Sequence, residues 1–204
     1  EDIFWNIWGL YGFAEPPLED SGSNSQGSAA KIRVFNPTVG LDGWSSHYTT
    51  IYVDQRDMPF LVDSLRMALN RWGLNIYTLQ SNPVWALRND LGTIEGIHSD
   101  YVENADREAL MIIEVDLLSE REIEELQREL TLVLDDVSTV VDSFDPMRMR
   151  LELLIAELKT NAPKVEQLDE SLAFLQWIYD GYFVFTGCAE FDLEVKDESV
   201  YLRE

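Results

Sequence analysis

The clearest hydrophobic pattern in the chain is a strand signal followed directly by a helix signal. Tyr48–Val53 is a run of β-branched and aromatic residues, which is typical of a strand. Apolar residues then recur at helical spacing over Leu61–Trp72, and Gly73 has the position of a helix C′ glycine. Asp57 is predicted to cap this helix, with Pro59 in its first turn. An apolar stripe of this kind has to pack on a sheet, so this segment is predicted to be the centre of the fold.

Other strands are predicted from alternation and from β-branched residues. They are expected at Lys31–Phe35, Leu74–Leu87, Leu110–Leu117, Tyr182–Phe185 and Phe191–Val195. Pro83 lies inside the second of these, which indicates an edge strand or a bulge. The polar stretch Ile94–Arg107 predicts a loop with a ragged strand.

Three helices are predicted after the strand at Leu110–Leu117. The first opens with a capping box of Ser119 and Glu122. The second begins near Pro146, with Asp145 as its cap, and the third runs over 165–181. A further helix is predicted over residues 3–13, and it is apolar nearly all round. This helix must be buried, either against this chain or against another part of a longer protein.

The order of these elements predicts an α+β fold. Strand, helix, strand, strand and helix form most of a ferredoxin-like βαββα(β) unit, in which helices cover one face of an antiparallel sheet. An additional helical segment follows. The closing strand has three candidate sources: Lys31–Phe35, the final pair of strands, or a partner.

This organisation predicts five parts of the chain. They are an aromatic-rich helix over 1–14, a flexible linker over 15–30, the sheet domain over 31–142, a helical extension over 143–181, and strands over 182–204 that begin a next module or close the sheet.

Charge and composition exclude several classes of partner. Fifteen basic against 38 acidic residues give a net charge of -23, so nucleic acids and anionic membranes are poor partners. No apolar run approaches the ~20 residues of a membrane span. The chain opens without a leader-like segment, and its beginning and end suggest a piece of a longer protein. The single cysteine, Cys188, fits a reducing compartment, so we expect a cytoplasmic protein.

No catalytic residue, cofactor site or metal site is predicted within these residues. His47 and His98 have no Cys or His at ligand spacing. The acidic residues at 120–125 fit the solvated first turn of a helix, and Cys188 has no identifiable base partner. The glycines match no dinucleotide or phosphate-binding loop.

The strand–helix turn is the one candidate binding site. Backbone N–H groups at a helix N-terminus favour an anion such as a carboxylate. The residues predicted for an effector site here are Gln55, Arg56, Asp57, Met58, Phe60, Leu61 and Val62. A simple connection between a strand and a helix is the alternative.

Three stretches of the chain resemble a known family. The run VDQRDMPFLVDSL, the earlier KIRVFNP and the later WIYDGYFVFTGCAEFDL are similar to the N-terminal region of the large bacterial NAD-specific glutamate dehydrogenases. The resemblance covers nearly the whole chain and rests mainly on DMPFLVDS. It implies an ACT-like regulatory or assembly domain over 31–142.

The resemblance implies the following function. The parent enzyme would convert L-glutamate to 2-oxoglutarate and ammonium with NAD, bound far downstream, while this fragment would be inactive and hold no cofactor. Its partners would be the rest of the parent chain, other copies in a homo-oligomer and a small amino-acid effector. The alternative is a free-standing amino-acid sensor with a carboxylate site at the turn.

One residue departs from the pattern of amino-acid-binding ACT domains. These domains typically place a glycine shortly after the proline, so that a ligand can approach the backbone. Phe60 occupies that place here. Its side chain would crowd the pocket, which favours a packing or interface role.

Overall fold

The computed structural model describes residues 2–16, 30–161, 167–189, 191, 193–196 and 199–202 of the 204-residue chain. The predicted linker therefore lies mostly outside the described residues. The chain divides into two compact units, Glu1–Val141 and Asp142–Glu204, and each is described by itself. The first unit contains α1 (Asp2–Ala14), β1 (Lys31–Phe35), α2 (Val39–Asp42), β2 (Thr49–Arg56), α3 (Leu61–Arg71), β3 (Ile76–Arg88), β4 (Ile94–His98), β5 (Ala105–Val115) and the start of α4 (Glu120–Thr160).

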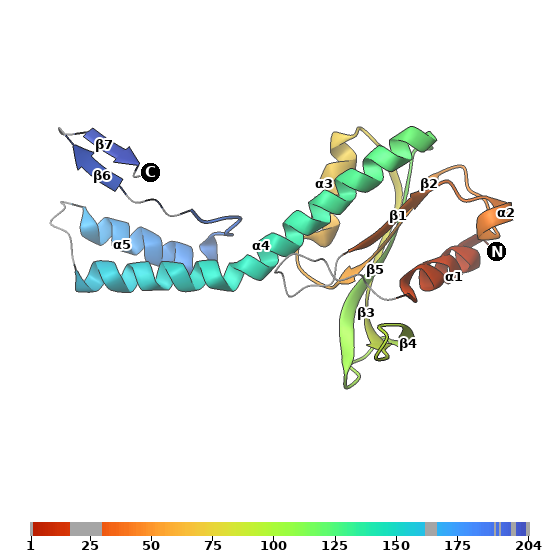
Figure 1. The fold of residues 1–204 in the computed structure, drawn as a ribbon, viewed down its shortest axis with the longest axis horizontal. Coiled ribbons are helices and arrows are strands. Elements are labelled where there is room, and N and C mark those ends of the chain that lie inside the picture. Colours follow the sequence, from red (N-terminus) through yellow and green to blue (C-terminus); the bar gives the residue numbers. More distant parts are fainter. Residues whose placement is uncertain are drawn as a thin grey trace. The chain divides into compact units, whose positions relative to one another are not determined.

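The first unit is built on a five-stranded antiparallel sheet in the order β1-β2-β5-β3-β4 (Figure 1). The elements β2, α3, β3, β5 and α4 follow the predicted βαββα order, which confirms the α+β, ferredoxin-like fold. The closing strand is β1, the first of the three candidate sources. It pairs antiparallel with β2, with Val34 opposite Ile51. The strand that completes the sheet therefore precedes the rest of the sheet in sequence.

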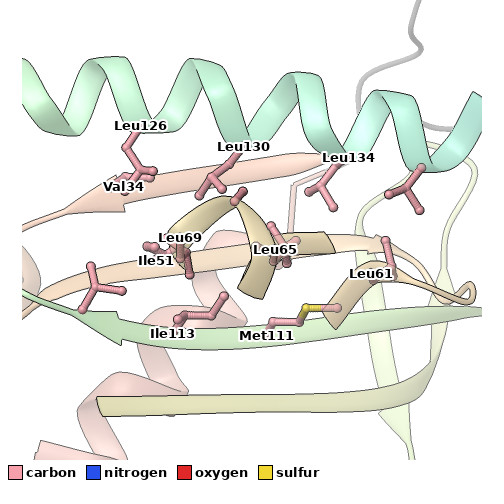
Figure 2. Close-up of a cluster of buried hydrophobic side chains, with 14 of the residues drawn as sticks. Val34, Ile51, Leu61, Leu65, Leu69, Met111, Ile113, Leu126, Leu130 and Leu134 are labelled. Atoms are coloured by element: carbon pink, nitrogen blue, oxygen red, sulfur yellow. The ribbon is translucent and has the colours of Figure 1, made fainter. Parts of the chain in front are cut away.

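The first face of the sheet is covered by α3 and the first part of α4. Figure 2 shows Leu126, Leu130 and Leu134 of α4 pointing toward the sheet and α3. Ile51 and Leu65 are fully buried in this same core, as the pattern at the centre of the chain predicts. Burial of one such aliphatic side chain stabilises the fold by about 1.5–3 kcal/mol. Met111, Ile113 and Val115 of β5 complete the core, as the alternation of Leu110–Leu117 predicts, but Leu117, expected on the same face, is 62% exposed beyond the end of the strand.

The opposite face of the sheet is partly covered as well, by α1 (Figure 1). Leu10 and Ala14 of this helix are buried with Tyr52 and Ile112 of the sheet. The close approach depends on Gly9, since a Cβ there would lie 2.8 Å from the Tyr52 hydroxyl oxygen. The apolar opening helix thus finds its partner within this chain, and β2 is buried on both of its faces.

The ends of the helices follow the sequence signals in two cases and depart from them in one. Gly73 has φ +74° and forms a Schellman motif with Leu74, whose N–H donates to the Leu69 carbonyl. The Ser119 N–H donates to the Glu122 carboxylate at 2.8 Å, which confirms the capping box of α4. The prediction that Asp57 caps α3 is wrong, because the helix begins only at Leu61.

The free edge of β1 is partly closed by a side chain of α4. The Val34 N–H, which points away from β2, donates to the Gln127 side-chain oxygen at 3.0 Å. An unpaired edge amide thereby receives an acceptor from within the same unit.

The second unit contains the rest of α4, α5 (Leu168–Trp177), a short π-helical turn η1 (Ile178–Tyr182) and the hairpin of β6 (Leu193–Lys196) and β7 (Ser199–Leu202). The prediction of a new helix at Pro146 is wrong, because α4 continues through this proline. A proline removes only one helical hydrogen bond, and the residues on both sides are compatible with a helix. Residues 162–166, where the third predicted helix starts, lie outside the described residues.

The predicted strand at Tyr182–Phe185 is also wrong. Tyr182 belongs to η1, and Phe183 and Val184 are each 53% exposed without a strand partner among the described residues. Aromatic residues favour strands only where a neighbouring strand can pair with them. Among the helices of the described ranges, none is long and apolar enough to cross a membrane.

Candidate functional site

The turn between β2 and α3 brings together the seven residues predicted as an effector site. Gln55 and Leu61 are buried, with 1% and 2% of their surface exposed, whereas Phe60 is 46% exposed. Arg56 is the last residue of β2 and Val62 belongs to the first turn of α3. The seven residues therefore share one place in the fold, but they do not all face one surface.

The polar side chains of this turn bind other parts of the first unit. The Gln55 amide donates to the Ser138 hydroxyl of α4 at 2.7 Å. The Asp57 carboxylate pairs with Arg107 Nε at 2.8 Å, and the Asp57 N–H donates to the Arg107 carbonyl. These two contacts hold Asp57 beside β5 and keep it from capping the helix. The turn is thus tied to α4 and β5, and effector binding here stays a prediction.

Phe60 has an unusual backbone conformation at the start of α3. Its φ of +73° lies in the left-handed region, and no side chain caps the helix at this position. This conformation costs an L-residue about 1–2 kcal/mol and is the one that glycine adopts most readily. The backbone therefore keeps the shape that a glycine at this place would have, while the side chain is aromatic.

A second group of polar residues lies on the α1 face of the sheet. It consists of four charged side chains from four strands: Lys31, Asp54, Arg88 and Glu108. Arg88 binds Glu108 through two nitrogens, at 2.6 and 2.8 Å, and reaches Asp54 at 3.3 Å. The side chains of Asp54 and Glu108 are 0% and 3% exposed. We call these four residues the charge cluster.

Burial sets the protonation of the charge cluster. The pKa of Asp54 is raised from 3.8 to about 7, mainly by loss of solvent and secondly by the nearby Glu108 carboxylate. Arg88 and Lys31 act in the opposite direction. Near pH 7 the Asp54 carboxyl group is therefore expected to be protonated part of the time.

The charge cluster also binds the last turn of α1. The Lys31 ammonium donates to the carbonyls of Phe13 at 2.7 Å and Pro16 at 2.8 Å, and Arg88 lies 3.4 Å from the Ala14 carbonyl. Cations at a helix C-terminus are favoured by the helix dipole. Asp54 and Glu108 are closed to solvent and hold Arg88, and Arg88 and Lys31 in turn join the end of α1 to the sheet.

Pattern reasoning missed this cluster. Asp54 belongs to β2 and lies just beyond the Tyr48–Val53 run that predicts the strand. A signal was nevertheless present, because both Asp54 and Glu108 occupy alternating strand positions on the face of the sheet that α1 covers. A charge at an inward strand position requires a partner.

The other candidate side chains form no site in the described residues of either unit. His47, His98 and Cys188 are exposed. Within the described ranges, no three His, Cys, Asp or Glu side chains gather closely enough to hold a metal ion. The acidic residues at 120–125 begin α4, where Glu122 serves the capping box.

Comparison with known proteins identifies the family. The family model described as "Glutamate dehydrogenase, ACT1 domain" matches residues 4–130. The chain is 39% identical over 171 residues to an NAD-specific glutamate dehydrogenase of Halomonas elongata. The aligned region covers 81% of this chain and 11% of that enzyme. It is 36% identical over 174 residues to an NAD-specific glutamate dehydrogenase of Pseudomonas aeruginosa. Here the aligned region covers 83% of this chain and 11% of that enzyme. Since the family model covers more than half of its residues, this chain belongs to the family of glutamate dehydrogenase ACT1 domains.

Proposed function

We propose that this chain is the N-terminal, non-catalytic regulatory and assembly domain of an NAD-dependent glutamate dehydrogenase. The parent enzyme would convert L-glutamate to 2-oxoglutarate and ammonium, with NAD as hydride acceptor. The observation that carries the proposal is the similarity of more than four fifths of the chain to enzymes of that name, of which it spans only 11%. Catalysis and NAD binding then belong to the remaining part of the parent.

The fold supports a regulatory or assembly role for the first unit. Its sheet is covered by helices on one face and by α1 on the other, and the predicted effector turn is tied to α4 and β5. This turn is the place where an amino-acid effector would act. We further propose that the parent is a cytoplasmic homo-oligomer, because the chain carries a single cysteine and β3 leaves part of one sheet edge without a partner strand.

The test compares the 204-residue chain with the full-length parent and with a parent that lacks residues 1–141. Formation of NADH from glutamate is measured for all three, and sedimentation gives their oligomeric states. We expect turnover by the full-length parent, none by the 204-residue chain, and altered assembly or amino-acid response after the deletion. Turnover by the 204-residue chain alone would overturn the proposal. So would a deletion that leaves assembly and kinetics unchanged.

A further inference from the structure

A groove lies on the second face of the sheet, in the part that α1 leaves open. Its volume is about 380 Å³, which is within the range of small-molecule sites. Its lining comes from α1, from the loop before β2, and from strands β3 and β5. The principal lining residues are Ile7, Trp44, Tyr48, Thr78, Ile112 and Glu114. All belong to the first unit, and none belongs to the predicted effector turn.

Glu114 is the single acidic residue among those that line the groove, and neither lysine nor arginine lines it. It lies on β5, the middle strand of the sheet. Among the described residues, no side chain forms an ion pair with its carboxylate or donates a hydrogen bond to it. Two acidic residues nearby in the sequence differ, since Glu108 of β5 binds Arg88, and Asp116, just after β5, accepts hydrogen bonds from Asn75 and Tyr77. The Glu114 carboxylate is thus available to a ligand.

A second polar group beside Glu114 also lacks a partner. Thr50 stands directly opposite Glu114 in the pairing of β2 and β5, on the same face of the sheet. It is 0% exposed, and its hydroxyl has no hydrogen-bond partner within the part of the chain that the structure describes. A buried hydroxyl without a partner is costly and is uncommon in folded proteins. Thr78 flanks Glu114 on the other side and lines the groove.

The chemistry of the groove selects a cation with an apolar body. The carboxylate attracts an ammonium group, and the neighbouring threonine hydroxyls offer acceptors for its remaining N–H donors. Trp44, Ile7 and Ile112 provide an aromatic and aliphatic wall for a carbon skeleton. The net charge of -23 raises the local concentration of small cations. An anionic ligand would find only repulsion at Glu114.

We propose that this groove binds a small primary amine, with its ammonium group against Glu114 and its apolar part against Trp44. The site is separate from the β2–α3 turn, and the proposal does not depend on the function of the parent enzyme.

The test uses three probes of similar shape and different charge: 2-phenylethylamine, 2-phenylethanol and 3-phenylpropionate. Binding to the 204-residue chain is measured by calorimetry, and nuclear magnetic resonance locates it through the indole N–H of Trp44. We expect saturable binding of the amine with a shift at Trp44. The alcohol should bind about tenfold more weakly or worse, because the charge-assisted hydrogen bonds are lost. The carboxylate should not bind.

Two variants distinguish the site from general attraction to an acidic protein. Glu114→Gln keeps the shape of the side chain and should weaken amine binding about tenfold or more. Glu95→Gln, at an exposed position on β4, removes the same charge and should leave binding unchanged. Both variants are checked for folding by circular dichroism, and Thr78→Val serves as a second probe of the groove. No saturable binding of the amine, equal binding of the alcohol, or equal losses in the two glutamine variants would overturn the proposal.

Discussion

Asp54 and Glu108 lie on neighbouring strands, and both contact the guanidinium of Arg88 beside the last turn of α1. Two buried carboxyl groups thus lie beside partly buried cations, on a face where most domains place apolar residues. Removal of one member leaves the others unpaired. The stability of the first unit should therefore depend on pH and on each member of the charge cluster.

The first prediction concerns pH. The pKa of Asp54 is raised from 3.8 to about 7, so between these values the folded chain holds a proton that the unfolded chain has released. The contribution of Asp54 to the free energy of unfolding is fully present below pH 4 and is lost as the pH rises to about 7. Asp54→Asn should remove this contribution, which urea unfolding at several pH values between 4 and 8 would measure. Asp63→Asn, on the exposed side of α3, is the control, and an unchanged slope in Asp54→Asn would contradict the prediction.

The second prediction concerns Arg88. Replacement by leucine leaves two buried carboxyl groups without their cation, which should cost about 3–5 kcal/mol in the free energy of unfolding. Arg88→Lys should recover only part of this, since an ammonium group cannot reproduce the two parallel bonds to Glu108. The control is Arg121→Leu, because the Arg121–Glu125 pair is exposed and is expected to contribute little to stability. Similar losses in Arg88→Leu and Arg121→Leu would show that the cluster does not stabilise the fold.

The third prediction concerns the packing of α1. Gly9→Ala places a methyl group 2.8 Å from the Tyr52 hydroxyl oxygen and should cost about 1–3 kcal/mol. Tyr52→Phe removes that oxygen and should make the alanine tolerable in the double variant, as a double-mutant cycle in urea would reveal. Gly12→Ala meets nothing within 4 Å and should instead stabilise the helix by about 0.5–1 kcal/mol. A loss at Gly12 equal to that at Gly9 would indicate a general intolerance of the helix.

The fourth prediction concerns the left-handed residue before α3. Phe60→Gly and Phe60→Ala both remove the aromatic ring, but only glycine fits φ +73° without strain. The glycine variant should therefore be about 1 kcal/mol more stable than the alanine variant in chemical unfolding. Equal stabilities would mean that the turn relaxes to another conformation. Calorimetry of the glycine variant with amino acids would also test whether the ring blocks an effector.

The predictable part of the fold is the part in which one apolar face repeats with a clear period. The alternation around Ile51 and the helical stripe through Leu65 point to one common core, and both residues are found there. The Ser119 capping box and the Gly73 helix end depend on contacts over a few residues, so they can be inferred locally.

The rest depended on contacts that no local pattern contains. The closing strand could come from three places, because the pairing of β1 with β2 is a tertiary contact that no periodicity within either segment specifies. The charge cluster joins residues from 31 to 108, and its members look like ordinary surface charges when they are viewed singly. Pro146 misled the helix assignment, since a proline marks a helix start more often than it lies inside a helix.

The bond from Val34 to Gln127 has a consequence for assembly. A strand from another molecule could pair with β1 only by displacing the Gln127 side chain from the Val34 N–H. This contact therefore disfavours extension of the sheet at the β1 edge. At the opposite edge of the sheet, the first part of β3 precedes the segment that pairs with β4. Among the described residues, no strand pairs with this part of the edge. If two copies of this domain extend one another's sheet, they should meet there.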